Sequence, residues 1–137
     1  DMTRSRGLGD VYKRQVRAGL ESVAYQMVVY LEFMKKSRNL NLKNLSVDGG
    51  MVKNKFFLQL ISNLLEIELN IPEMEDMSSY GALLFGMQYY HNLKNTSDLK
   101  DFKVKSYKII PNIDDTIRNS FISWKEIVDK HFVKNQD

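Results

Sequence analysis

A short apolar run that ends at two glycines sets the limits on how this chain can fold. Leu45-Ser46-Val47 runs into Asp48-Gly49-Gly50, which predicts a buried strand closed by a glycine turn. Asn54 is then placed to cap a helix, since apolar residues follow it at helical spacing: Phe57, Leu58, Leu60, Ile61, Leu64 and Leu65. An extended segment over 66–71 follows and is ended by Pro72. Strand, helix and strand in this order indicate an α/β fold.

Helices are predicted on both sides of this unit. Apolar residues three or four apart predict a long helix over 16–36, and Ser78 or Ser79 is expected to cap a third helix over 80–91. In that third helix the small residues Gly81, Ala82 and Gly86 are expected to allow close backbone packing.

Two further elements are predicted near the end of the chain. Residues 102–110 alternate in character and predict a strand closed by Pro111. Asp114 and Asp115 then precede a last helical stripe that contains Phe121 and Trp124. Because so few short strands cannot close a sheet core alone, the pattern indicates a truncated α/β domain.

Composition excludes several classes of function. The 137 residues contain no Cys, which rules out disulfides, thiol catalysis and Cys-ligated zinc, and the two His cannot form a metal site alone. No apolar run approaches the roughly 18 residues of a membrane-spanning helix. The formal net charge is +3, and most of that excess lies in the first fifteen residues. We therefore expect a cytoplasmic protein without a nucleic-acid or membrane partner.

Residues 1–15 differ in character from the rest of the chain. They show neither helical nor strand periodicity, and the pattern changes abruptly at Val16. The hexapeptide DVYKRQ at 10–15 resembles, codon for codon, the translation of a transposase mosaic-end sequencing adapter. We expect 1–15 to be a non-native, adapter-derived or disordered leader, and 16–137 to be a piece of a longer protein. A natural basic tail is the alternative.

The glycine turn is the strongest candidate for a binding site. Paired glycines let a backbone approach a ligand closely, and the helix behind Asn54 offers unpaired N–H groups to an anion. Nucleotide loops are built in this way, but Asp48-Gly49-Gly50 also has the composition of an ordinary turn. Other polar groups carry less weight. The loop with Glu73, Glu75 and Asp76 is interpreted as solvated rather than as a Mg²⁺ site, and His91 and His131 as structural or surface groups.

Several motifs together resemble one enzyme family. Residues 16–26, VRAGLESVAYQ, resemble the R-A-x-L-E-S-I-A-Y-Q helix of glycerol kinases, which belong to the FGGY carbohydrate kinases. Residues 45–54, LSVDGGMVKN, are similar to the family's L-R-V-D-G-G-A-V-x-N segment. Pro72-Glu73 matches its R-P-E turn, Gly81-Ala82 its T-A-L-G-A-A helix start and Trp124-Lys125 its terminal W-K pair. The resemblance covers 16–131 in order.

The resemblance implies a fold, an activity and a set of site residues. The fold would be a truncated actin-like, ribonuclease H-like ATPase domain, the C-terminal half of the second kinase domain. The intact enzyme would transfer the γ-phosphoryl group of ATP to glycerol with Mg²⁺. Gly50 and Asn54 match the family's nucleotide contacts, with Gly49 as loop support. The catalytic Asp, the phosphate loop, the polyol site and the metal ligands would all lie upstream of this piece, and the parent is expected to be a homo-oligomer.

Other functions stay open at this point. A sister sugar or polyol kinase, for xylulose or gluconate, would differ in substrate only. A non-enzymatic actin-like module would use the same Asp48-Gly49-Gly50 loop to bind a nucleotide. In a helical interaction domain without a ligand, the two glycines would form a plain turn.

Overall fold

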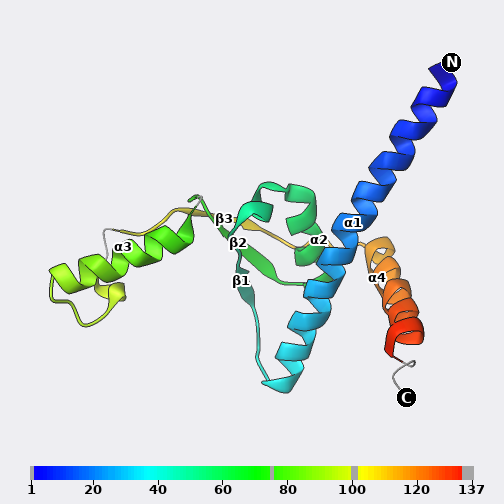
Figure 1. Ribbon diagram of the computed structural model, residues 1–137. Coiled ribbons are helices and arrows are strands. Elements are labelled where there is room, and N and C mark those ends of the chain that lie inside the picture. Colours follow the sequence, from blue (N-terminus) through cyan, green and yellow to red (C-terminus); the bar gives the residue numbers. More distant parts are fainter. Residues whose placement is uncertain (1, 75, 100–101, 134–137) are drawn as a thin grey trace.

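The computed structural model describes residues 2–74, 76–99 and 102–133. Within these ranges four α-helices and three strands follow one another along the chain (Figure 1): α1 (Met2–Ser37), β1 (Asn44–Ser46), α2 (Lys55–Leu65), β2 (Glu68–Pro72), α3 (Met77–Tyr90), β3 (Ser106–Ile109) and α4 (Asp115–Val128). Short 3₁₀ turns lie at Gly50–Lys53 (η1) and Thr96–Asp98 (η2), and a π-helical turn at Asp129–Val133 (η3) follows α4.

The three strands form one mixed sheet in the order β1-β2-β3. β1 runs parallel to β2, with Leu45 opposite Leu69, and β3 pairs antiparallel to β2, with Ile109 opposite the same Leu69. Two parallel neighbours need a crossover connection, and α2 provides it. This confirms the predicted α/β fold. It also places the carboxyl ends of β1 and β2, and therefore the glycine turn, at one edge of the sheet.

The hydrophobic core lies where α2 packs against α1, α4 and the sheet, as the ribbon shows (Figure 1). The most deeply buried apolar side chains come from these elements: Val28 of α1, Leu58 and Ile61 of α2, and Leu69 and Ile71 of β2. Ser62 is the one buried polar side chain among the described residues, and its Oγ donates a hydrogen bond to the Ile67 carbonyl at 2.8 Å. The predicted stripe of α2 therefore faces the core.

An aromatic cluster joins α4 to α1. The ring of Tyr25 lies 5.4 Å from that of Phe121 and 5.4 Å from that of Trp124, centroid to centroid. Burial raises the pKa of the Tyr25 hydroxyl, so this group stays protonated within the cluster. Asp114 caps α4 by accepting a hydrogen bond from the Thr116 N–H at 2.8 Å. The predicted last helix and its acidic start are confirmed.

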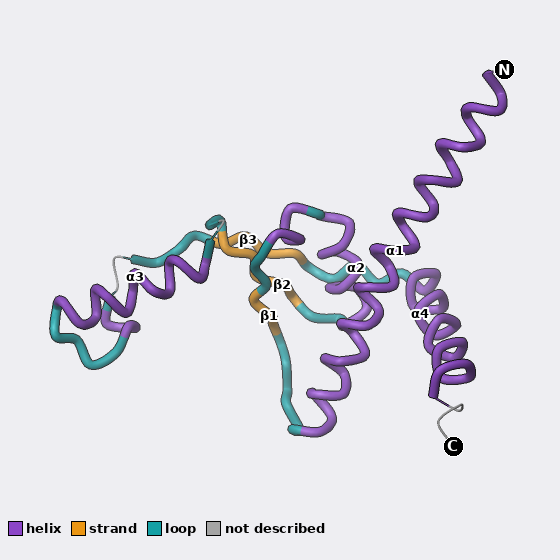
Figure 2. Tube along the Cα trace, viewed as in Figure 1, coloured by secondary structure: helices purple, strands orange, loops and turns teal. Residues whose placement is uncertain are grey.

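The long first helix begins earlier than the periodicity predicts. α1 starts at Met2 rather than near Val16, and its first half projects away from the rest of the chain (Figure 2). Val11 is 52% exposed and Tyr12 68% exposed, so this half is not held by core packing. Nothing in 10–15 breaks a helix, and a helix nucleated by the packed residues further along can therefore extend backward.

The third helix departs from its prediction in two ways. Its cap is Asp76, not Ser78 or Ser79: the Asp76 carboxylate accepts hydrogen bonds from the Ser79 hydroxyl at 2.6 Å and the Ser79 N–H at 2.9 Å. The hydrogen bond from the Ser79 hydroxyl has the larger effect, and together with the bond from the Ser79 N–H it lowers the pKa of the Asp76 carboxyl. The expected close packing at Gly81 and Gly86 is absent from the described residues, since a Cβ built on either glycine meets nothing within 4 Å.

Candidate functional site

The glycine turn closes β1 with a backbone that only glycine adopts easily. The Val47 N–H donates to the Asn70 carbonyl at 3.1 Å and so holds the end of β1 against β2. Two residues later, Gly49 has φ 102° and ψ 179°, a conformation that L side chains rarely adopt. Gly50 needs no such conformation, and both glycines are exposed. Gly49 therefore makes the turn, while Gly50 leaves room beside it.

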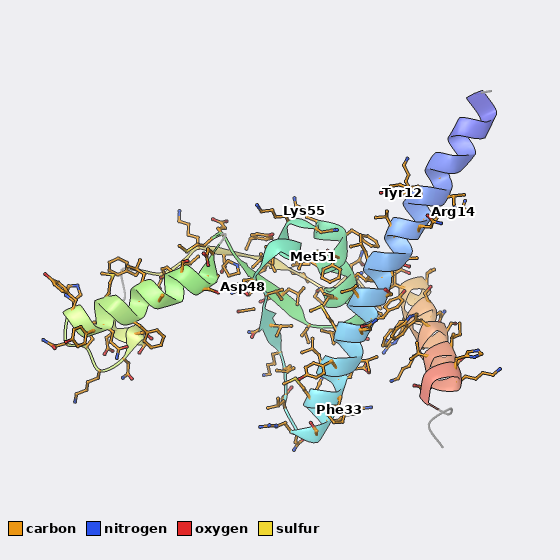
Figure 3. The ribbon with its side chains drawn as sticks, in the orientation of Figure 1. Tyr12, Arg14, Phe33, Asp48, Met51 and Lys55 are labelled. Atoms are coloured by element: carbon orange, nitrogen blue, oxygen red, sulfur yellow. The ribbon has the colours of Figure 1, made fainter. Side chains whose placement is uncertain are left out.

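A 3₁₀ turn carries the chain from the glycines to α2. In η1 the Val52 N–H donates to the Gly49 carbonyl at 3.1 Å, and the Asn54 N–H donates to the Met51 carbonyl at 3.0 Å. Figure 3 shows Asp48 near the end of β1, Met51 on the segment that leads into α2, and Lys55 at the start of that helix. The glycine turn and the start of α2 are thus joined by a hydrogen-bonded connection rather than by a loose loop.

Asn54 is the N-cap of α2, as predicted. Its Oδ1 accepts a hydrogen bond from the Phe57 N–H at 3.1 Å, and its backbone carbonyl accepts the first helical bond from Leu58. Because the cap uses Oδ1, the described contacts leave the Nδ2 amide of Asn54 as the group that can donate to a ligand. An incoming anion would also meet the positive end of the α2 dipole.

A groove of about 310 Å³ lies beside the two glycines. Residues from the end of β2 and from β3 form its other walls: Ile71, Pro72, Glu73, Met74 and Tyr107. An added Cβ on Gly50 meets nothing within 4 Å, so the turn leaves its space open. The sequence did not predict Tyr107 at this place, because the pairing register of β3, more than fifty residues after the glycines, brings it there.

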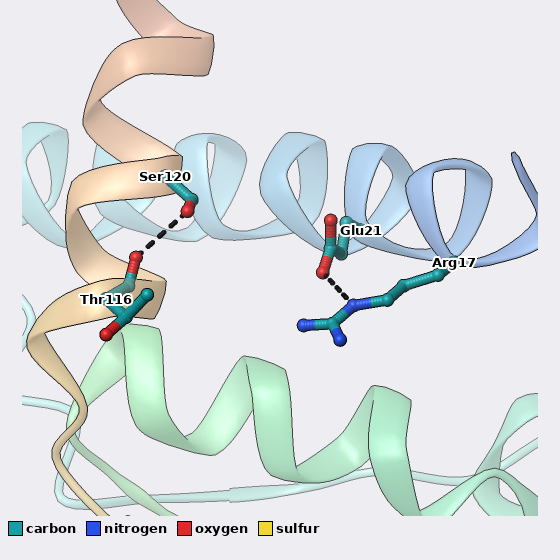
Figure 4. A network of polar contacts seen from close by, with 4 residues as sticks. All are labelled: Arg17, Glu21, Thr116 and Ser120. Carbon is teal, nitrogen blue, oxygen red and sulfur yellow. Dashed lines mark hydrogen bonds and ion pairs between the residues drawn. The ribbon is translucent and has the colours of Figure 1, made fainter. Parts of the chain in front are cut away.

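Asn54 lines a different groove, on the side of α1. This second groove has a volume of about 410 Å³ and includes Arg17 and Phe56. The Arg17 guanidinium lies 5.3 Å above the Phe56 ring and forms an ion pair with Glu21 at 2.7 Å (Figure 4). The Glu21 hydrogen bond raises the pKa of Arg17 further, so Arg17 stays cationic. The predicted contacts thus line two different grooves, Gly49 and Gly50 the first and Asn54 the second.

The described residues form no metal centre. No group of three or more His, Asp or Glu side chains among them lies close enough to bind a cation. Asp76 of the predicted acidic loop caps α3, while Glu75 lies outside the described residues. Nor does any helix in the described part of the chain combine the length and the apolar character that crossing a lipid bilayer demands.

Comparison with known families identifies this arrangement. The sequence profile of the FGGY family of carbohydrate kinases, C-terminal domain, matches residues 2–89, which contain the glycine turn and Asn54. The chain therefore belongs to the FGGY carbohydrate kinase family, as the motifs indicated.

The most similar curated relatives include glycerol kinases. The enzyme of Francisella tularensis subsp. holarctica is 32% identical over 116 residues, which is 84% of this chain and 23% of the relative. The enzyme of Francisella tularensis subsp. novicida is 31% identical over 116 residues, which again is 84% of this chain and 23% of the relative. This chain therefore spans about a quarter of the length of the curated relatives that it matches.

Two solved structures share the fold. Plasmodium falciparum glycerol kinase with ADP matches with a TM-score of 0.70 at 22% identity, over 85% of this chain and 24% of that one. Xylulose kinase from Lactobacillus acidophilus matches with a TM-score of 0.54 at 19% identity, over 64% of this chain and 18% of that one. At these identities both likenesses establish the fold, the actin-like fold of the family.

Proposed function

We propose that this chain supplies the adenosine side of the ATP site in a longer kinase that phosphorylates glycerol to glycerol 3-phosphate. The observation that carries the proposal is the turn at Gly49 and Gly50, which is open to solvent at the carboxyl end of β1 and leads into the capped start of α2. Ligands of open α/β sheets bind outside this edge, at the carboxyl ends of the strands. Glycerol kinases among the relatives support the choice of acceptor.

Each site residue has a distinct part in this proposal. Gly49 holds the turn through its positive φ, and Gly50 lets the backbone approach the adenosine and the α-phosphate. Asn54 donates a hydrogen bond to the nucleotide through Nδ2 while its Oδ1 keeps α2 capped. The solved glycerol kinase with ADP supports a nucleotide as the ligand.

The remaining chemistry is assigned to the upstream part of the parent. Phosphoryl transfer needs an acceptor site, a base for the hydroxyl, a phosphate loop and a divalent cation. The described residues do not fit a Mg²⁺ site, since no cluster of acidic ligands occurs among them. We therefore expect the 137-residue chain alone to show no glycerol-dependent turnover of ATP. The intact parent is proposed to be a cytoplasmic homo-oligomer.

The test is steady-state kinetics on the intact parent enzyme. Gly50→Val should raise the KM for ATP far more than the KM for glycerol, because a branched side chain fills the space beside the turn. Asn54→Ala should raise the KM for ATP by roughly 2- to 13-fold, the equivalent of one hydrogen bond of about 0.5 to 1.5 kcal/mol. Gly19→Val, on the exposed face of α1, is the matched control and should leave both constants unchanged.

Three results would contradict the proposal in different ways. Unchanged ATP kinetics in a folded Gly50→Val enzyme would make the glycine pair a plain turn. Turnover with xylulose or gluconate in place of glycerol would keep the nucleotide site but assign the parent to a sister kinase. ATP binding without turnover on any polyol would favour a non-enzymatic nucleotide-binding module.

A further inference from the structure

Tyr107 lies in the groove beside the glycine turn, and the function proposed above gives it no part. Among the described residues that line this groove it is the only aromatic one. The residue is 38% exposed, so part of its side chain is covered and part faces the groove and solvent. An aromatic ring in the wall of a groove presents a flat apolar surface to a ligand. The position of this ring therefore bears on what the groove can bind.

The sheet places Tyr107 on the face that α2 covers. In the antiparallel pair of β2 and β3, Tyr107 lies opposite Ile71, and Ile109 lies opposite Leu69. Residues opposite each other in such a pair point to the same face of the sheet. Ile71 and Leu69 are buried in the core, against which α2 packs. Tyr107 is therefore on the α2 face, and its exposure shows that the cover of this face ends there.

Backbone pairing fixes Tyr107 relative to the glycine turn. The Glu73 N–H, one residue after β2, donates to the Lys105 carbonyl at 2.8 Å and so extends the pairing towards the start of β3. On the other side of β2, the Val47 N–H donates to the Asn70 carbonyl. Because β1 is parallel and β3 antiparallel to β2, the end of β1 and the start of β3 meet at one edge of the sheet.

The size and chemistry of the groove favour a flat apolar group. Its volume of about 310 Å³ is at the lower end of the roughly 300 to 1,000 Å³ of small-molecule pockets, so it admits a ring system rather than a whole nucleoside triphosphate. Ile71, Pro72 and Met74 add apolar surface beside Tyr107. Phosphates are charged and a sugar is rich in hydroxyls, whereas every base has a π face that stacks on an aromatic ring. Of the parts of a nucleotide, the base therefore matches this groove.

We propose that Tyr107 holds the base of the nucleotide by stacking and sets a preference for purine over pyrimidine nucleotides. This inference rests on the nucleotide site of the proposed function and adds the residue that selects the base. The base occupies the groove, while the sugar and the phosphates stay outside it, over Gly50. A purine has two fused rings and a pyrimidine one, so a purine covers more of the Tyr107 ring. Stacking reads ring area rather than hydrogen-bonding groups, so adenine and guanine should both be accepted.

Calorimetric titration of the intact parent with ADP and with CDP tests the proposal. The wild type should bind ADP more tightly than CDP. Tyr107→Ala should weaken ADP binding by roughly 5- to 30-fold, the lower part of the range for stacking on an aromatic ring, because the residue is partly exposed. CDP binding should weaken less, so the preference for the purine falls. The KM for glycerol should stay unchanged in this variant.

Two further variants at the same position separate stacking from a structural role. Tyr107→Phe keeps the ring face and should bind ADP within about twofold of the wild type. Tyr107→Leu keeps an apolar side chain opposite Ile71 without a flat ring, and its ADP affinity should lie between those of the Phe and Ala variants. Lys108→Ala is the matched control. Lys108 is the next residue of β3, points to the opposite face and pairs with Glu68 at 2.8 Å, so its loss should leave both affinities unchanged.

Several results would overturn the assignment of Tyr107. These are equal affinities for ADP and CDP in the wild type, unchanged ADP binding in folded Ala and Leu variants, and a loss in the Phe variant as large as in the Ala variant. Gly50→Val distinguishes this failure from failure of the proposed function, because a Cβ beside the sugar and phosphates should weaken ADP and CDP alike. If Gly50→Val weakens both nucleotides while Tyr107→Ala weakens neither, only the assignment of Tyr107 is refuted. If neither variant weakens binding, the nucleotide site itself is refuted.

Discussion

Asn54 combines a structural role and a proposed ligand role that use different atoms of one side chain. Oδ1 accepts the Phe57 N–H, and Nδ2 is the group assigned to the nucleotide. Asn54→Asp keeps an acceptor for the Phe57 N–H and removes the donor. Asn54→Ala removes both. The two substitutions therefore separate the stability of α2 from the binding of ATP.

The expected effects on stability follow from the cap geometry. Loss of an N-cap side chain costs about 0.5 to 2 kcal/mol. Phe57 is only 3% exposed, so water replaces the lost acceptor poorly, and we expect Asn54→Ala to fall at about 1 to 2 kcal/mol. That is a factor of roughly 5 to 30 in the folded-to-unfolded ratio. Asn54→Asp should stay close to the wild type, since Asp caps as well as Asn and its charge suits the helix dipole.

Urea denaturation of the 137-residue chain measures this difference. Trp124 is the only tryptophan of the chain, and its contact with Tyr25 makes its fluorescence a reporter of the packing of α4 on α1. An Asp variant as unstable as the Ala variant would refute the view that an oxygen acceptor at residue 54 holds α2. In the intact parent the order should differ: the KM for ATP should rise more for Asn54→Asp than for Asn54→Ala, because a carboxylate repels the phosphates.

Two further predictions concern stability and use the same assay. Removal of residues 1–15 should change the free energy of unfolding by less than about 0.5 kcal/mol, because Val11 and Tyr12 are mostly exposed; a larger loss would make this segment part of the fold. Ser62→Ala should lower the free energy of unfolding by about 1 to 2 kcal/mol, because the Ile67 carbonyl loses its hydrogen-bond partner. Ser120→Ala, at an exposed position, loses a hydrogen bond to the Thr116 carbonyl (Figure 4) and should lower it by less than about 0.5 kcal/mol. Equal losses of stability in the two variants would contradict this prediction.

The parts of the fold that depend on neighbouring residues could be predicted from the sequence. The cap at Asn54, the glycine turn at Gly49 and the acidic start of α4 each involve residues within a few positions of one another. Side-chain chemistry then decides the local backbone with little help from the rest of the molecule. The prediction that Ser78 or Ser79 caps α3 was wrong: Asp76 is the cap, and Asp and Ser are equally good residues at that position. Only the position at which the helix actually starts decides between them.

The parts that depend on distant residues could not be predicted in the same way. The groove beside Gly50 takes one wall from Tyr107, which reaches it through the antiparallel register of β2 and β3. A one-residue shift in that register would turn Tyr107 to the other face of the sheet, and no motif near the residue fixes the register. Likewise, the separation of Gly50 and Asn54 into two grooves follows from the path of η1, which spacing alone does not give.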